Sequence, residues 1–225
     1  MSQFQNIKVR AYLQSEVITD GYCPLDAAIY YHFIREKFGV QHRTSPLKSD
    51  VAEYSGLNLP ILKCNTKHPF WFYACSFAQW SKDAKYSKHM KTRRFDNQNA
   101  MKYVDFGKKR GKVEIKKGAY KNYFINEYTI SSPFVEWYLV ANVEEFEQYL
   151  TFVKHIGKKS SGAVAKWEIE PFEHDWSIRG YEDNRPMRTF PTLSNPNAPV
   201  YGVRPSYWHP RHKCNVFLPK VAFCV

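Results

Sequence analysis

The sequence lacks the features of a membrane protein and of a disulfide-rich domain. No apolar run approaches the ~20 residues that a membrane-spanning helix needs, and the amino-terminal segment MSQFQNIKVR has no signal-peptide core. The five cysteines are widely scattered and form no CxxC pair, which fits a reducing compartment better than a disulfide framework. We therefore expect a cytoplasmic protein that has no contact with a membrane.

A metal-binding motif is also lacking. His209, His212 and Cys214 are close in sequence, but Pro210 and Arg211 interrupt them, and no fourth ligand stands at a suitable spacing. We expect no metal and no other cofactor.

Acidic residues are scarce where basic residues are most abundant. The 225 residues carry a formal charge of +12, with a pI near 9.4. Residues 82–122 contain fourteen lysines and arginines against four acidic residues, so this stretch carries +10 of the +12. Aromatic residues are interleaved with these charges: Tyr86, Phe95, Tyr103, Phe106 and Tyr120. The pattern is typical of nucleic-acid binding, because cations contact phosphates and rings stack on bases. The alternative is a basic face that is merely solvated.

Aromatic and apolar residues are plentiful, at 17% and 44% of the chain, and can fill a sizeable core. Residues 7–13 alternate apolar and polar side chains, which predicts a strand with one buried face. The other face carries Lys8, Arg10 and Tyr12, and we expect these three to contact RNA. Residues 24–38 then show the apolar spacing of a helix that begins at Pro24 and ends before Gly39.

The basic stretch has weak periodicity and resembles an insertion or a long hairpin. Its tip is expected at Lys108-Lys109-Arg110, and short strands are expected on either side of Lys116-Lys117-Gly118. We expect RNA contacts from the cations and the aromatic residue of this part: Lys108, Lys109, Arg110, Lys116, Lys117, Tyr120 and Lys121.

Residues 142–172 read as a helix, a glycine-bounded loop and a strand in succession. The apolar positions from Phe146 to Ile156 predict a helix of about four turns, with a capping box formed by Asn142 and Glu145. Lys154 and His155 would occupy the last turn, and Gly157 would end the helix. The alternation that follows predicts a strand with Ala163, Ala165, Trp167 and Ile169 on its buried face.

The loop between them, here called the glycine loop, consists of Gly157, Lys158, Lys159, Ser160, Ser161 and Gly162. Two ammonium groups, two hydroxyls and a backbone that a ligand can approach closely are what a phosphate group needs. The alternative is a helix stop followed by a polar turn.

Strand, helix and strand thus occur twice in the first 170 residues, which predicts an α+β, ferredoxin-like (RRM-like) sheet with helices on one face. Seven of the thirteen prolines lie between Pro186 and Pro219, so extended or turn structure is expected there. We expect a domain over residues 1–185 with its insertion at 82–122, and a Pro-rich extension over residues 186–225 that packs on the domain.

The chain resembles the RAMP superfamily of CRISPR proteins, and within it the Csf-type subunit of type IV systems that caps the 5′ handle of the guide RNA (crRNA). The resemblance spans residues 7 to about 190 and is carried by five motifs: DGYCPLD at 20–26, FWFYACS at 70–76, RRFD at 93–96, GAYKNY at 118–123 and HIGKKSSG at 155–162. In the family the glycine-rich loop usually continues with a further glycine, where this chain has Ala163-Val164-Ala165.

This resemblance implies a non-catalytic subunit that binds the crRNA 5′ handle and caps the backbone of an effector ribonucleoprotein. The basic insertion would be the family's thumb, and base pairing would read most of the sequence. The implied partners are Cas seven-like backbone subunits, a Cas eight-like large subunit and target DNA near the protospacer-adjacent motif (PAM).

Two alternatives remain open. Some RAMP relatives cut repeat RNA without a metal, using histidine, tyrosine and lysine, and His32, His68, His89 and His155 are the candidate histidines here. A generic single-stranded RNA-binding protein would differ by a weak sequence preference.

Overall fold

The central sheet has four strands in the order β5-β8-β1-β9, and all neighbours run antiparallel. The strands are β1 (Gln5–Leu13), β5 (Gln79–Trp80), β8 (Phe134–Ala141) and β9 (Val164–Pro171). The computed structural model describes residues 3–38, 58–94, 96, 122–180, 183–192 and 194–220.

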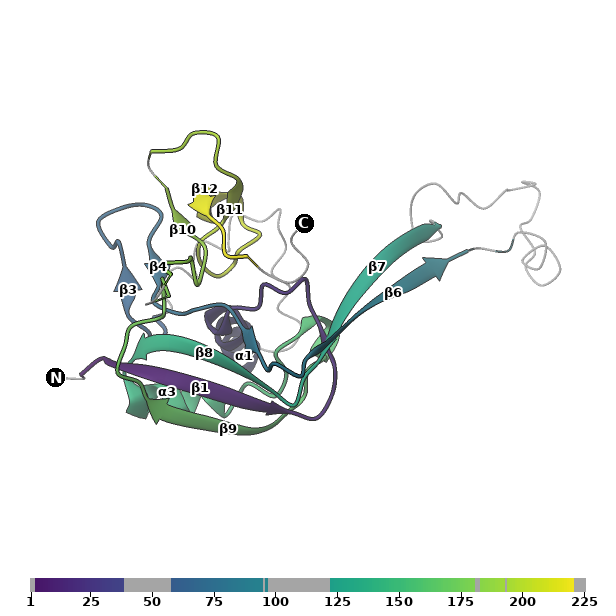
Figure 1. Ribbon diagram of the computed structural model, residues 1–225, viewed down its shortest axis with the longest axis horizontal. Coiled ribbons are helices and arrows are strands. Elements are labelled where there is room, and N and C mark those ends of the chain that lie inside the picture. Colours follow the sequence, from purple (N-terminus) through teal and green to yellow (C-terminus); the bar gives the residue numbers. More distant parts are fainter. Residues whose placement is uncertain are drawn as a thin grey trace.

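Two helices, α1 (Leu25–Phe38) and α3 (Val143–Leu150), lie on the same side of this sheet (Figure 1). The core lies between them and the apolar face of β1 and β8, where Val9 and Trp137 have no exposed surface. The Trp137 indole Nε1 donates to the carbonyl of Cys23 at 2.8 Å, so burial leaves this group satisfied. The strand predicted over 7–13 and the helix over 24–38 are confirmed.

The second helix is shorter than predicted. α3 has eight residues and ends at Leu150, whereas the sequence pattern extended it to Ile156. Asn142 is the N-cap residue, but its side chain makes no capping hydrogen bond, so the predicted capping box is not formed. Gly157 does not end a helix; it precedes a 3-10 turn, η2 (Lys158–Ser160).

The segment after α3 turns back and pairs across the glycine loop. The amide of Ile156 donates to the carbonyl of Gly162 at 3.1 Å, and the amide of Val164 donates to that of Lys154 at 3.0 Å. Val153 and Ile156 stay buried, as their spacing predicted. Because β-branched residues favour extended backbone, the cross-loop pairing replaces the last turns of the predicted helix.

Strand β9 follows the predicted alternation only in its second half. Tyr12 pairs with Lys166 and Leu13 with Val164, so Ala165 is the extra residue of a bulge. The bulge places Val164 against the core beside Trp167 and Ile169, whereas Ala165 is exposed. The predicted buried position of Ala165 is therefore wrong.

The basic stretch contributes one arm of a long hairpin that projects from the body (Figure 1). β6 (Lys85–Arg93) pairs along its whole length with β7 (Tyr123–Ser131), and the base of β7 pairs with β2 (Val17–Ile18). A hairpin is confirmed, although its return arm begins at Tyr123, beyond the predicted insertion.

The proline-rich part forms a second small sheet with the order β10-β12-β11. Its strands are β10 (Phe190–Pro191), β11 (Val200–Gly202) and β12 (Lys213–Phe217), with a 3-10 turn η3 (Pro210–His212) before the last. Phe190, Val203 and Val216 pack on Phe72 of β4 (Phe72–Tyr73), which pairs with β3 (Lys63–Cys64).

The architecture is α+β and rich in sheet. None of the helices in the described ranges is both long and apolar enough to cross a membrane.

Candidate nucleic-acid interface

The β6–β7 hairpin presents two faces of different chemistry. Side chains alternate along a strand, so Lys85, Lys91 and Arg93 share one face with His89. We call these four residues the basic face. All of β6 is exposed, and the only carboxylate among the β7 residues paired with it, Glu127, lies opposite His89. A strand so exposed and so cationic fits a polyanion better than it fits a core.

The opposite side of the hairpin is the apolar face, formed by Tyr86 and Met90 of β6 and Phe124 and Tyr128 of β7. Met90 is 64% and Phe124 61% exposed, which is unusual for side chains of this size and polarity. The ammonium group of Lys88 lies 5.6 Å from the Tyr128 ring centroid. The hairpin therefore offers three cations on one side, and on the other an apolar contact area that includes a single lysine, Lys88.

Strand β2 joins the base of the hairpin to the glycine loop. Its Val17 and Ile18 pair with Ile130 and Thr129 of β7. On its other side the amide of Ile18 donates to Ser161 Oγ at 2.8 Å. An ion pair from Lys159 to Glu127 of β7 also connects loop and hairpin. The glycine loop therefore lies against the base of the hairpin whose β6 strand carries the cations.

Within the glycine loop, several groups already have partners inside the protein. Lys158 Nζ lies 2.9 Å from Asp20 Oδ2, and Ser161 Oγ donates to the carbonyl of Lys158 at 2.7 Å. Both lysine side chains remain more than half exposed, so an anion can still reach them. Lys159 and Ser160 have positive φ angles of 57° and 58°, which turns the chain sharply at this point.

Packing within the protein explains why glycine stands at both ends of the loop. Gly162 has φ +68°, and a Cβ there would lie 2.8 Å from Val17 and 2.9 Å from Ile156. A Cβ on Gly157 would lie 2.3 Å from Ser161 Oγ. Close packing of the loop on β2 thus requires both glycines, whether or not a ligand approaches.

The outer face of β1 is neutralised by its neighbouring strands. Lys8 Nζ lies 2.6 Å from Glu170, and Arg10 Nη2 lies 2.6 Å from Glu136. The Tyr12 hydroxyl donates to Glu168 at 2.8 Å, and this hydrogen bond lowers the pKa of the Glu168 carboxyl. Lys8, Arg10 and Tyr12 are thus committed to a cross-strand network, and their predicted role in RNA contact gains no support from their surroundings.

A cavity of about 440 Å³ lies between α1 and the glycine loop. His32 and Tyr31 of α1 line it, together with His155 and Lys158. His32 Nε2 is 2.8 Å from the carbonyl oxygen of His155, and burial lowers the pKa of His32, so its imidazole is neutral near pH 7. Cys23 also lines the cavity, but burial raises the pKa of its thiol to about 12, which rules out a thiolate at neutral pH.

The other two candidate histidines lie elsewhere. His68 Nδ1 accepts from the amide of Phe70, and His89 belongs to the hairpin. In the tail, His209 and His212 have ring centroids 5.1 Å apart, and no group of three metal-ligating side chains occurs among the residues that the structure describes.

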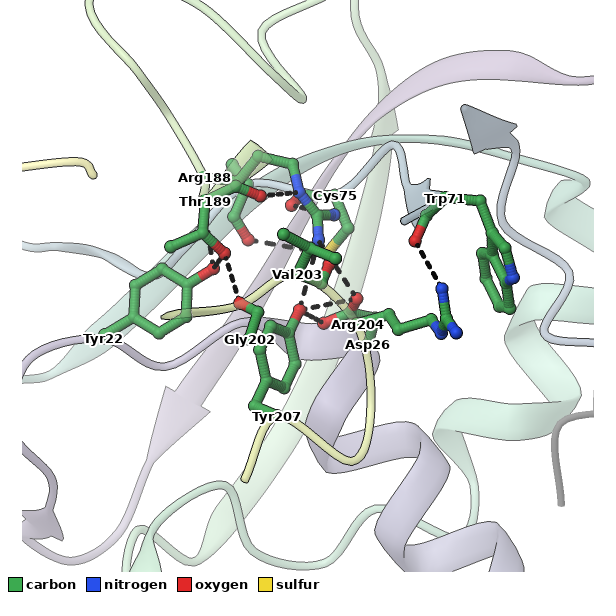
Figure 2. A network of polar contacts seen from close by, with 11 residues as sticks. Tyr22, Asp26, Trp71, Cys75, Arg188, Thr189, Gly202, Val203, Arg204 and Tyr207 are labelled. Carbon is green, nitrogen blue, oxygen red and sulfur yellow. Dashed lines mark hydrogen bonds and ion pairs between the residues drawn. The ribbon is translucent and has the colours of Figure 1, made fainter. Parts of the chain in front are cut away.

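A buried network fixes the tail against α1 (Figure 2). Arg188 is fully buried, and its guanidinium donates to the carbonyls of Thr189, Cys75 and Val203 at 3.1, 3.1 and 2.6 Å. Its Nη2 is 3.8 Å from Asp26 of α1, which is also fully buried, and the Tyr207 hydroxyl lies 2.9 Å from both Asp26 oxygens. Side chains from α1 and from the tail thus belong to one buried polar network.

The family model for CRISPR type IV associated protein Csf3 matches residues 6–219. The chain belongs to the Csf3 family. Its membership makes it a type IV CRISPR-associated protein. The search of curated proteins found no match.

In this Csf3 family member, sequence reasoning grouped the glycine loop with cations of the basic stretch. Lys108, Lys109, Arg110, Lys116, Lys117, Tyr120 and Lys121 lie outside the described residues. The sequence analysis did not single out Tyr31, although its position next to His32 on a predicted helix indicated that one of the two had to leave the buried face. The cations of β6 were not singled out individually either.

Proposed function

We propose that this protein is a non-catalytic subunit of a type IV CRISPR effector ribonucleoprotein that binds the 5′ handle of the crRNA. The observation that carries the proposal is the exposed cationic surface of the β6–β7 hairpin with the glycine loop at its base, where β2 and the Lys159–Glu127 pair connect the two. Such a surface suits a single RNA strand, because it offers several phosphate contacts along one path.

The topology supports assignment to the RAMP superfamily. The sheet order β5-β8-β1-β9, with α1 following β1 and α3 following β8, is what a ferredoxin-like domain would have, and it supports this part of the proposal. In that frame the β6–β7 hairpin is the thumb-like insertion between the second and third strands of the domain. A projecting thumb can reach a neighbouring subunit, and the exposed apolar face with Met90 and Phe124 suits a protein contact.

From this position the protein would cap the backbone of Cas seven-like subunits and contact a Cas eight-like large subunit. It would also help to position target DNA near the PAM. Sequence would be read mainly by pairing between guide and target, so the protein needs to recognise the shape of the handle and a few of its bases.

Purified protein mixed with labelled repeat RNA, once in EDTA and once in Mg²⁺, tests this proposal. We expect tight binding without cleavage in both buffers, and enrichment of repeat-derived 5′ ends when the RNA that copurifies from cells is sequenced. Equal binding of unrelated single-stranded RNA would instead identify a generic RNA-binding protein.

One observation favours a second candidate, a metal-independent repeat endoribonuclease. His32, Tyr31 and Lys158 line one cavity, so the residue types that can move protons are close together there. In that case the same assay would show a discrete cut in EDTA that His32→Ala abolishes. His68→Ala is the matched control, since His68 does not line this cavity.

A further inference from the structure

A second cavity, of about 380 Å³, shares part of its lining with the first. Tyr31, Ala27 and Lys158 line both cavities. Both volumes fall within the roughly 300–1,000 Å³ that is typical of small-ligand sites. Tyr31 is therefore a shared wall of two hollows of similar size.

The Tyr31 ring is exposed and yet held in place. It is 51% exposed, although aromatic rings of the core are buried in this molecule. Arg35, one helical turn further along α1, donates from Nη1 to the Tyr31 hydroxyl at 3.1 Å, and its guanidinium carbon lies 5.3 Å from the ring centroid. The His32 ring contacts Tyr31 edge to face at 5.4 Å. A fixed, solvent-facing ring is a platform on which another flat group can stack.

The charged side chains that line the two hollows are cations, although Lys158 and Lys159 also pair with Asp20 and Glu127, which line neither hollow. Lys158 and Lys159 line the first, Lys158 and Arg35 line the second, and no Asp or Glu is among the described residues that line either. Trp208, from the tail, adds a second ring, 37% exposed, to the second hollow. Tyr207, the neighbour of Trp208, also lines the second hollow, and its hydrogen bond to Asp26 holds this part of the tail in place.

We propose that the two cavities receive two consecutive unpaired nucleobases of an RNA strand, with Tyr31 as the wedge between them and Lys158 beside the connecting phosphate. Two hollows that share one aromatic wall and one cation match a ligand made of repeating flat, anionic units. Single-stranded RNA has this chemistry, whereas a duplex keeps its bases paired and stacked internally. The inference rests on the proposed function, since it names where the bound RNA is read.

Abasic scanning tests the inference. A labelled single-stranded RNA with the repeat-derived 5′ sequence is made with one base removed at a time, and each version is titrated with the full-length protein. Wild-type protein should show two consecutive positions at which base removal weakens binding, by roughly 5- to 150-fold each. With Tyr31→Leu the same two positions should lose most of this effect, because the ring that stacks on them is gone.

Three further variants complete the test. Tyr31→Phe keeps the ring but loses the hydrogen bond from Arg35, so it should retain more of the effect at both positions than Tyr31→Leu does. Trp208→Leu should affect only the position in the second cavity. Phe4→Leu is the matched control, because Phe4 is 43% exposed and lines neither cavity. Trp208→Leu also keeps the inference testable if Tyr31→Leu does not fold.

Two results would overturn the inference, and they are distinguishable. If wild-type protein does not bind the RNA, the proposed function fails and the inference with it. If wild-type protein binds but Tyr31→Leu and Trp208→Leu give the same abasic profile as Phe4→Leu, the proposed function stands and the wedge is wrong.

Discussion

At the scale of single residues, the pair formed by Asp26 and Arg188 carries the most consequence for stability. Both side chains are fully buried, and each has hydrogen-bond partners besides the other. Removing one member of a buried pair leaves an uncompensated charge, which costs more than the intact pair contributes. The two residues come from α1 and from the segment before β10, so their interaction connects the body to the tail.

We predict that Arg188→Met lowers the free energy of unfolding by about 3–5 kcal/mol at neutral pH. Burial raises the pKa of Asp26, and Arg188 opposes this rise. Without Arg188, the native state holds the Asp26 proton to a higher pH than the unfolded chain does. The native state then binds more protons, so stability falls as pH rises above the ordinary aspartate pKa of about 3.9.

Urea unfolding at about pH 5 and about pH 8 measures this effect. The variant should lose more stability between the two pH values than wild type does. The double variant Asp26→Asn with Arg188→Met is the control, since it has no carboxyl at this position and should show no extra loss. If Arg188→Met had the same pH dependence of stability as wild type, Arg188 would have no effect on the pKa of Asp26.

At the residue scale, local sequence patterns predict which side chains are buried but not which distant side chains they meet. The apolar alternation of residues 7–13 was enough to predict the buried face of β1, which includes Val9. Nothing local in the sequence links Asp26 to Arg188 or Lys8 to Glu170, because these partners meet only once the sheet and tail are assembled. The RNA contact predicted for Lys8, Arg10 and Tyr12 therefore stays a prediction, and the structure adds that their polar groups are paired within the sheet.

At the scale of elements, the hairpin was predictable in kind and the end of α3 was not. Charge density and weak apolar periodicity indicated an exposed insertion, and β6 is exposed along its whole length. Helical spacing from Phe146 to Ile156 was real, since these apolar residues are buried, but burial does not require a continuous helix. Pairing of residues 154–157 with 161–164 decided the backbone, and such pairing depends on the turn between them.

Substitutions on the two faces of the hairpin should affect different properties: RNA affinity for the basic face and copurification with neighbouring subunits for the apolar face. We predict that reversing the basic face with Lys85→Glu, Lys91→Glu and Arg93→Glu lowers RNA affinity for matched and scrambled handles alike. Each lost phosphate contact to a single strand should reduce the slope of log K against log salt by about 0.7. Filter binding at several salt concentrations measures both quantities.

The matched change on the apolar face is Met90→Ser with Phe124→Ser, which leaves the charge intact. It should keep RNA affinity and its salt slope, and should weaken copurification with the neighbouring subunits of the complex. An unchanged salt slope in the charge-reversed hairpin would leave the basic face as a merely solvated surface.

At the scale of the whole molecule, the tail is part of what holds the body together. Phe190, Val203 and Val216 cover Phe72, and Arg188 and Tyr207 satisfy Asp26 in α1. Tyr207 and Trp208 also line the second cavity. Packing of the tail on the body was expected from the sequence, but the residues it covers were not, because proline predicts extended backbone and not what the extended chain contacts.

We predict that truncation after Arg185 removes cooperative folding rather than trimming an appendage. The shortened chain would expose Phe72 and leave the buried Asp26 carboxyl without Arg188 and Tyr207, and a buried charge without a partner costs several kcal/mol. Stabilities of small domains are about 5–15 kcal/mol, so this loss is a large part of the total. Urea unfolding followed by circular dichroism and by tryptophan fluorescence should give coincident transitions for the full chain and no sharp transition for the truncated one. The prediction is wrong if the chain ending at Arg185 unfolds cooperatively and at the same urea midpoint as the full-length protein. Residues 1–185 would then fold without residues 186–225.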